Sequence, residues 1–364
     1  MRLFTIEKRP SPSGGLVLLT SVLAILAALV VAGIFFWAWG ASPLHAYRLI
    51  LQGALGSKLG LAETVRRAIP LLLCGVGLTL AFRALFWNIG AEGQLLLGAV
   101  AATWVALFSG LEGPWLIPAM LALGFLAGAI WALIPALLKA RLGINDVITT
   151  LMMNYIAMYL VLYLIHGPWK GPQMRGFAYT DFFPKAAWLP LVPGTRIHWL
   201  TLILGVLAAL GAYILLTKTK RGFEIRVIGE NPEAARFAGM SYTRTILLVM
   251  ALSGGLAGLA GVGEVAGVHH ILRQPEQISL GYGYTAIIVA WLAQRNPLAV
   301  ILTALLLGAL MAGGDVIKAS LGLPFQLVNM FNGLILAFLI SAELLMRYKV
   351  SFRPRRKGWA GRPG

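Results

Sequence analysis

The stretch K-T-K-R-G-F-E-I-R-V-I-G-E-N-P-E-A-A-R-F-A-G-M-S-Y-T-R, residues 218–244, is the longest polar interval in an otherwise mostly apolar chain. It carries six positive side chains and lies between two apolar runs of roughly twenty residues. Of the 364 residues, 59% are hydrophobic and only 12% are charged, and the mean hydropathy is +0.81. A soluble domain has about a quarter of its residues charged. The sequence therefore predicts an integral membrane protein.

A short helix is predicted within this stretch. Asn231 is a favourable N-cap, and Pro232 suits the first helical position, where its missing N–H would have no partner. Glu233 lies in the first turn, where the helix dipole favours an anion, and Gly239 can adopt the left-handed conformation that ends a helix. We expect a helix over residues 232–238. It is either a handle for a soluble partner or a surface helix that only shortens a loop.

The apolar runs determine the fold class. Their length and the short loops between them indicate helices and not a barrel. We predict an all-α, polytopic membrane protein of about ten transmembrane helices with a cytoplasmic coupling helix, and a range of about nine to eleven spans stays open. The predicted spans are residues 16–39, 69–86, 93–109, 115–138, 147–165, 198–217, 246–267, 283–294, 297–315 and 327–346.

The positive residues indicate the topology. With the N-terminus inside, the inner loops hold about two thirds of the 30 Lys and Arg residues, so both termini are expected to be cytoplasmic. The net charge is +17, and the positive residues flank the apolar spans. Anionic lipid is therefore the expected partner, and nucleic acid is not. The predicted parts are a cytoplasmic N-terminal segment (1–15), a transmembrane domain (16–346), an external loop (166–197), a cytoplasmic loop (218–245) and a basic cytoplasmic tail (347–364).

The external loop 166–197 is rich in Pro and aromatic residues. This composition predicts an ordered, irregular cap. It is either an interfacial aromatic belt or a docking surface.

Polar residues inside the predicted membrane domain are candidates for a translocation path. N-I-G-A-E-G-Q (88–94) interrupts two apolar runs, and such breaks either line a path or make a tight turn. In the fifth span, after a possible N-cap at Asp146, polar residues recur four apart and so share one helix face. In the seventh span, small residues permit close helix crossing. The path candidates are Asn88, Glu92, Gln94, Thr150, Asn154 and Glu264.

Several kinds of chemistry are missing from the sequence. It has no Gly-x-x-x-x-Gly-Lys-Ser/Thr loop and no metalloprotease or hydrolase motif. The adjacent His269 and His270 would point different ways on a helix, so no metal site is predicted. Energy for transport therefore comes either from a soluble partner or from an ion gradient, with Glu92 or Glu264 as the coupling group.

Three motifs together resemble one family. N-I-G-A-E-G-Q (88–94), G-I-N-D-V-I-T-T-L-M-M-N-Y-I-A (143–157) and G-E-N-P-E-A-A-R-F-A-G (229–239) are similar to the permease subunits of bacterial ABC importers. The nearest branch is that of nucleosides and simple sugars, within the branched-chain amino acid/ribose permease superfamily. The resemblance covers residues 67–347. The last motif looks like the family's coupling segment, carried here by Gly229, Asn231, Pro232, Glu233, Ala234, Ala235, Arg236 and Gly239.

The resemblance implies a transport subunit and not an enzyme, in a bacterial inner (plasma) membrane. Its partners would be ABC ATPase subunits that bind ATP-Mg, a second, non-identical permease subunit and a periplasmic or lipid-anchored substrate-binding protein. No cofactor is implied in this chain. The expected solute is a nucleoside. The alternatives are a simple-sugar ABC permease or an ion-coupled stand-alone carrier.

Overall fold

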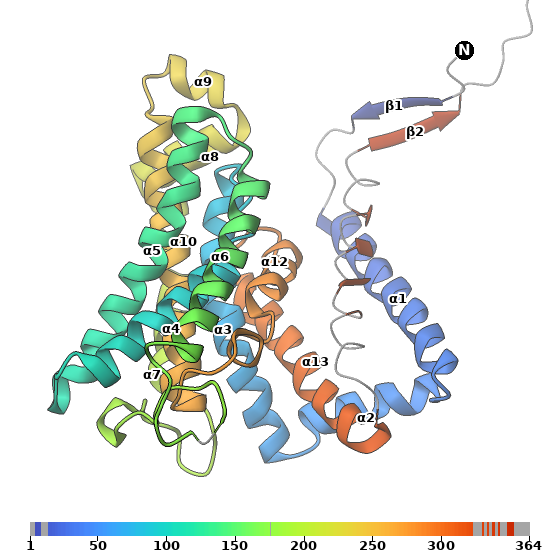
Figure 1. Ribbon diagram of the computed structural model, residues 1–364. Helices are drawn as coiled ribbons and strands as arrows, with labels where there is room; N and C mark the ends of the chain where they lie inside the picture. The colour runs from blue at the N-terminus through green and yellow to red at the C-terminus, as the bar shows by residue number, and fades with distance from the viewer. Residues whose placement is uncertain are drawn as a thin grey trace, which may run out of the picture. The chain divides into compact units, whose positions relative to one another are not determined.

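The computed structural model describes residues 4–8, 14–174, 176–322, 330, 333–334, 337–338, 341–342 and 348–352 (Figure 1). The chain forms two compact units, residues 1–44 with 329–364, and residues 45–328. Most of the predicted N-terminal segment (1–15), of the tenth span (327–346) and of the basic tail (347–364) lies outside the described residues.

The first unit contains helix α1 (Gly14–Ala38) and an antiparallel pair of strands, β1 (Phe4–Lys8) and β2 (Tyr348–Phe352). In the register of this pair, Phe4 stands opposite Phe352, and Ile6 stands opposite Val350. The sequence prediction did not include these strands. The signal was present in part, because apolar and polar residues alternate over residues 4–7 and 348–352, which is the period of a strand.

The second unit is helical. Its helices are α2 (Pro43–Leu55), α3 (Lys58–Arg83), α4 (Ala91–Phe108), α5 (Leu116–Leu142), α6 (Asp146–His166), α7 (Trp199–Lys218), α8 (Lys220–Glu230), α9 (Pro232–Phe237), α10 (Tyr242–Glu264), α11 (Pro275–Ser279), α12 (Tyr282–Leu292) and α13 (Ala299–Leu321). Short η1 (Gly113–Trp115), η2 (Lys185–Ala187) and the π-helix η3 (Val265–His269) complete it. Among the described residues, seven helices are long and apolar enough to cross a membrane, or eight if α1 and α2 form one bent span.

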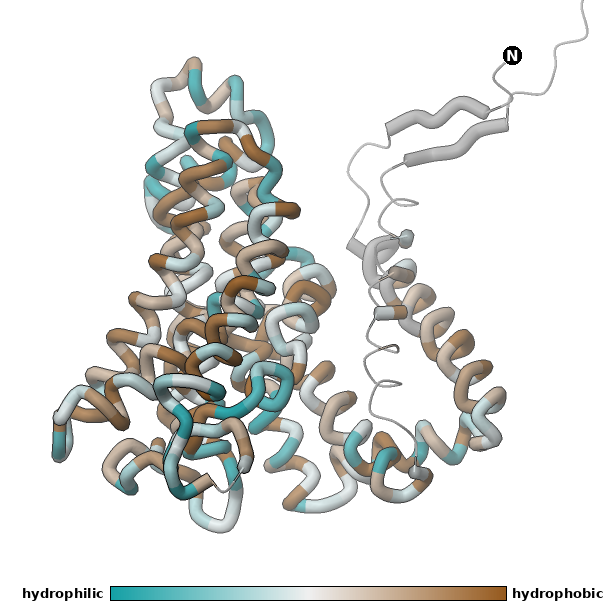
Figure 2. The backbone as a smooth tube through the Cα atoms, in the orientation of Figure 1, coloured by the Kyte–Doolittle hydropathy of each residue, from teal (hydrophilic) through white to brown (hydrophobic). Residues whose placement is uncertain are grey.

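The all-α, polytopic prediction is confirmed, and the second to ninth predicted spans each correspond to a helix. The hydrophobic segments lie along the middle of the second unit, and the polar ones gather near α8 and α9 and in the loops at the opposite end (Figure 2). Helix α3 begins well before the predicted residue 69, and α12 has only 11 residues. The early start was hidden because Arg66 and Arg67 lower the hydropathy, yet both side chains are buried and ion-paired.

The core of this unit is built around α10, which packs on α3, α4 and α5. Glycines bring the backbones together. A Cβ placed on Gly258 would overlap the carbonyl of Gly124, and one on Gly254 would overlap the carbonyl of Gly128. Any residue larger than glycine at these positions would push α5 and α10 apart. The predicted close crossing of the seventh span is therefore confirmed.

Helix α8 was not predicted, because its segment reads as a basic loop. The Oγ1 of Thr219 accepts a hydrogen bond from the N–H of Gly222 at 3.0 Å and caps the helix. Ile225 and Ile228 are fully buried. Gly229 lies directly against the carbonyl of Arg83 at the end of α3, where no Cβ would fit. These contacts fix α8 on the ends of α3 and α7.

Candidate functional site

The short helix predicted over residues 232–238 is present as α9. The side-chain oxygen of Asn231 accepts hydrogen bonds from the N–H groups of Glu233 and Ala234, each at 3.0 Å. Pro232 occupies the first helical position, and Gly239 has a φ of +75°. The cap and the left-handed residue end the helix on both sides, as the sequence predicted.

Only one residue of α9 is buried against the rest of the described chain. Ala235 is 1% exposed, whereas Glu233, Ala234 and Arg236 are exposed. Phe237 is 93% exposed, a residue that the sequence analysis did not single out. The sequence alone does not indicate this, because the exposure of Phe237 depends on which side of the short helix packs on the protein. Helix α9 therefore presents a free face with an apolar side chain on it.

The turn before α4 is closed by an amide pair. The Nδ2 of Asn88 donates to the Oε1 of Gln94, and the Nε2 of Gln94 donates to the Oδ1 of Asn88, each at 3.0 Å. Asn88 also donates to the Oγ of Ser253 on α10 at 3.0 Å. Both amides are buried, and these bonds satisfy groups that would otherwise be costly to bury.

Helix α6 holds the same turn from the other side. Thr150 Oγ1 accepts a hydrogen bond from the N–H of Ile89 at 3.2 Å. Asn154 accepts from the N–H of Gly93 and donates to the carbonyl of Ile89, both at 2.9 Å. The two residues share one helix face, as their spacing predicted.

Asp146 does not cap α6. The N-cap is Asn145, whose Oδ1 accepts from the N–H of Val147 at 2.9 Å. Asp146 instead pairs with Lys139 Nζ on α5 and accepts from the N–H of Trp87, both at 2.6 Å. Because the first turn of a helix suits an anion as well as a cap, sequence alone does not separate the two positions.

The two buried glutamates lie in different places. Glu92 accepts a hydrogen bond from the N–H of Gly283 at 2.8 Å and so holds the start of α12. Glu264 lies at the C-terminal end of α10, 4.0 Å from Arg66 Nη1 and 3.8 Å from His269 Nε2. Five of the six path candidates therefore gather around the 88–94 turn, and Glu264 stands apart.

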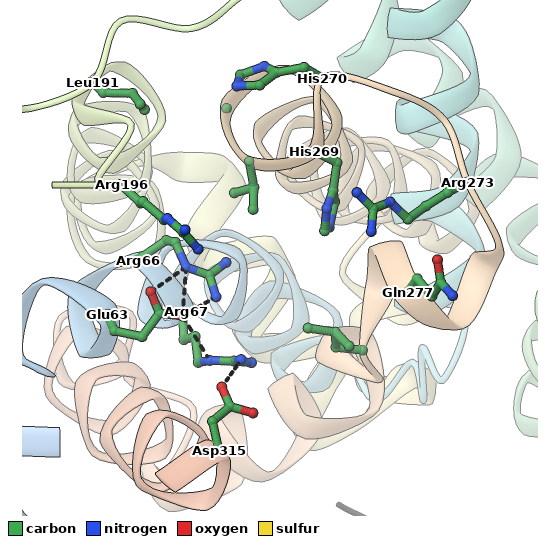
Figure 3. Close-up of a pocket in the computed structure, with 13 residues that line it drawn as sticks. Glu63, Arg66, Arg67, Leu191, Arg196, His269, His270, Arg273, Gln277 and Asp315 are labelled. Atoms are coloured by element: carbon green, nitrogen blue, oxygen red, sulfur yellow. Dashed lines mark hydrogen bonds and ion pairs between the residues drawn. The ribbon is translucent and has the colours of Figure 1, made fainter. Parts of the chain in front are cut away.

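A pocket of about 650 Å³ opens beside Glu264, at the end of α10 that is remote from α9. Arg66, Arg67 and Arg196 point into it, with His269 and Arg273 facing them (Figure 3). These arginines are spread over three regions of the sequence, so no local motif indicated the site. The pocket is lined by Glu63, Arg66, Arg67, Leu191, Arg196, Gly267, Val268, His269, His270, Arg273, Gln277, Leu280 and Asp315.

The loop between α6 and α7 forms part of the rim of this pocket. Its backbone N–H groups at Phe183 and Leu189 donate to the carbonyls of His270 and Ala266, both at 2.9 Å. The rings of Trp188 and His270 stack with centroids 3.9 Å apart. The predicted ordered, irregular loop is confirmed. In the part of the chain that the structure describes, no three His, Cys, Asp or Glu side chains are placed to hold a metal ion.

Comparison with known proteins identifies the family. Residues 60–342 match the family described as branched-chain amino acid transport system / permease component. The chain is 39% identical to the glucose ABC transporter permease protein TsgB13 of Haloferax volcanii, covering 93% of this chain and 91% of that protein. It is 34% identical to the guanosine ABC transporter permease protein NupP of Bacillus subtilis (89% and 93% covered). It is 31% identical to the nucleoside ABC transporter permease protein NupB of Lactococcus lactis (88% and 90% covered).

The family model and the three relatives all match most of the chain. The residues that match the family model include the three sequence motifs. A chain of this family is a transport subunit and not an enzyme, and no cofactor is expected in it. The chain belongs to the branched-chain amino acid transport system permease family, as an ABC importer permease of the nucleoside and sugar branch.

Proposed function

We propose that this chain imports nucleosides, forming the translocation path with a second, non-identical permease subunit while separate ATPase subunits act on α9. The observation that carries the coupling role is the free face of α9, with Phe237 93% exposed. The proposed coupling residues are those of the capped segment, Gly229, Asn231, Pro232, Glu233, Ala234, Ala235, Arg236 and Gly239.

The contacts of α9 suit a helix that transmits movement. Ala235 faces inward, and the neighbouring α8 lies on the end of α3 through Gly229. A partner that covers Phe237 would gain about 1.5–3 kcal/mol from the burial of that side chain. Arg236 and Glu233 lie exposed on the same short helix and would fix the orientation by charge pairing. A push on this helix would therefore reach α10 directly and α3 through α8.

Nucleosides are favoured by two of the three relatives, whose names give guanosine and nucleosides. A simple sugar is the second candidate, because the relative with 39% identity is named for glucose. The buried amides and carboxylates of the path candidates hydrogen-bond equally well to a ribose or a hexose. The binding protein that delivers the solute is proposed to dock on the external loop 166–197.

The ion-coupled, stand-alone carrier is set aside, because the chain belongs to an ABC permease family. The environment of Glu92 agrees with this, since its carboxylate already accepts the N–H of Gly283. We propose that the path candidates around the 88–94 turn fix that turn, and that Glu264 acts at the C-terminal end of α10. The turn candidates are Asn88, Glu92, Gln94, Thr150 and Asn154.

The test is reconstitution of the chain with ATPase subunits, a second permease and a binding protein of this family from the same organism. We expect ATP-dependent uptake of guanosine into liposomes, with no uptake when either the ATPases or the binding protein is left out. Uptake of glucose but not guanosine would establish the sugar permease instead. Uptake by the chain alone, without ATP, would refute both candidates.

The proposed topology places the loop 218–245 and both termini in the cytoplasm of a bacterial inner membrane, and the loop 166–197 outside. Cys74, the single cysteine of the sequence, is buried, which makes the chain suitable for labelling. A membrane-impermeant maleimide added to intact spheroplasts is expected to label Phe182→Cys and to leave Ala234→Cys unlabelled until the membrane is broken. Labelling in the reverse order would overturn the topology.

A further inference from the structure

We propose that the pocket at the C-terminal end of α10 is an oxyanion site that binds a carboxylate or phosphate group. This goes beyond the proposed function, because a neutral nucleoside needs no such site. The pocket is lined by more positive than negative side chains, and several of its guanidinium N–H donors have no acceptor within the described part of the chain.

The carboxylates of the pocket are already engaged. Glu63 accepts from Arg66 Nε through both oxygens at 2.9 Å, and it lies 3.3 Å from Arg67 Nε. Asp315 pairs with Arg67 Nη2. The pocket lining therefore holds four arginines against two paired carboxylates, and Glu264 beneath it adds one further negative charge. The positive side chains remain in excess.

The guanidinium donors are not all used. Arg196 and Arg273 form no ion pair with any residue that the structure describes. The Nε of Arg273 and the Nη1 of Arg67 are buried without a hydrogen-bond acceptor. Arg67 itself is only 6% exposed, so its free donor is turned into the protein and not toward bulk water. A buried donor without an acceptor is costly, and a ligand that brings acceptors removes that cost.

The arginines come from three separate elements. Arg66 and Arg67 lie on α3, Arg196 on the loop before α7, and Arg273 on the segment between η3 and α11. Figure 3 shows their guanidinium groups directed toward the same space from different sides. Each presents a planar fork of N–H groups, which matches the paired oxygens of a carboxylate or phosphate. One oxyanion at the centre would join the three elements.

The chemistry of the lining excludes other ligand classes. A cation would meet the excess positive charge. An apolar ligand would leave the free guanidinium donors unpaired, at the cost just described. A volume of about 650 Å³ falls in the range of small-molecule sites, so the oxyanion has room to carry a ring or chain with it.

The test uses the full-length chain in detergent and inorganic phosphate as the probe. Isothermal titration calorimetry at constant ionic strength, balanced with chloride, is expected to show saturable binding of phosphate. Arg196→Gln and Arg273→Gln each remove one guanidinium group that forms no ion pair with a described residue. A lost charge-assisted hydrogen bond corresponds to at least roughly tenfold weaker binding. Thermal unfolding without phosphate checks that both variants remain folded.

The matched control is Arg236→Gln, an equal change of charge on the exposed α9 at the other end of α10. It is expected to leave phosphate binding unchanged. Equal weakening by Arg236→Gln would show non-specific attraction and overturn the site, as would the absence of saturable binding. If one variant fails to fold, Arg196→Lys keeps the charge and loses the fork, and an unchanged affinity would overturn the proposal.

Repeating the titration in nanodiscs of two different lipids distinguishes a free solute from a lipid as the source of the oxyanion. Phosphate binding that is equal in nanodiscs of phosphatidylcholine and of phosphatidylglycerol assigns the site to a free solute. Binding that disappears only in phosphatidylglycerol assigns it to an anionic lipid headgroup. Both results support the oxyanion site. None of these measurements needs ATPase subunits or nucleoside, so a negative result would leave the proposed transport function standing.

Discussion

Asn88 and Gln94 exchange two hydrogen bonds of 3.0 Å across the turn that leads into α4. Because both amides are buried, Asn88→Leu leaves the amide of Gln94 without partners and is expected to destabilise the fold by about 1–3 kcal/mol. Gln94→Leu is expected to cost less, because Asn88 still donates to Ser253 and accepts from the N–H of Gly90. Thermal unfolding of the detergent-purified chain measures both effects.

The double variant Asn88→Leu/Gln94→Leu tests the pairing itself. It is expected to cost less than the sum of the single changes, because neither amide is then left facing a missing partner. Gln52→Leu, at an exposed position on α2, serves as the control and is expected to have little effect. Strict additivity would show that the two amides are independent.

The exposed ring of Phe237 is expected to contribute to ATPase coupling. Phe237→Ser should reduce binding-protein-stimulated ATP hydrolysis and uptake by the reconstituted transporter by roughly tenfold, the effect of losing about 1.5 kcal/mol of contact. The chain should still insert and unfold at the wild-type temperature, since this side chain contacts little within the protein. Leu59→Ser, at an exposed position near the start of α3, is the control. Equal coupling in both variants would remove Phe237 from the interface.

The crossing of α5 and α10 is expected to tolerate no side chain at its centre. Gly258→Ala would place a methyl group against the backbone carbonyl of Gly124, and overpacking of this kind costs about 1–3 kcal/mol. Gly211→Ala on α7 meets nothing within 4 Å and should be neutral or slightly stabilising. Detergent thermal stability compares the two. A harmless Gly258→Ala would mean that the helices separate easily.

Acidification is expected to destabilise the chain through His198, which precedes α7. Burial, with a contribution from the Arg66 guanidinium, lowers the pKa of His198 to about 3. Below about pH 6.5 the unfolded chain takes up a proton that the folded chain refuses, so stability falls as the pH drops toward 3. The loss approaches about 1.4 kcal/mol per pH unit.

The comparison variant for this effect is His198→Gln, which stays neutral at every pH. Its unfolding temperature, measured from pH 7.5 to 4.5, is expected to fall less steeply than that of the wild type. Parallel curves would show that another group carries the acid sensitivity.

The membrane helices were predictable because each contains a continuous apolar run, and the hydropathy of the sequence reveals such a run. The start of α3 was not, since Arg66 and Arg67 are tolerated only through Glu63 and Asp315, and Asp315 lies far away in the sequence. Helix α8 was missed for a related reason. Its basic surface hides the two isoleucines that fix it on neighbouring helices.

The candidate site was predictable where the signal is local. The cap of α9 follows from Asn231 and Pro232, and the shared face of Thr150 and Asn154 follows from their spacing. The outward direction of Phe237 needed the position of α8. The arginine pocket needed the whole fold, because only the packing of α3, the loop 166–197 and the segment between η3 and α11 brings Arg196 and Arg273 together.

The glycine contacts of α10 with α4 and α5 have a mechanical consequence. Backbone-to-backbone packing at Gly98, Gly124, Gly128, Gly254 and Gly258 leaves little room for side-chain rearrangement there, so we expect α10 to tilt as a stiff rod. With 23 residues it is about 35 Å long, and a tilt of about 5° at the α9 end displaces its far end by about 3 Å. That displacement equals the length of a hydrogen bond. A barely visible rotation on one side of the membrane is thus enough to make or break contacts around His269 on the other.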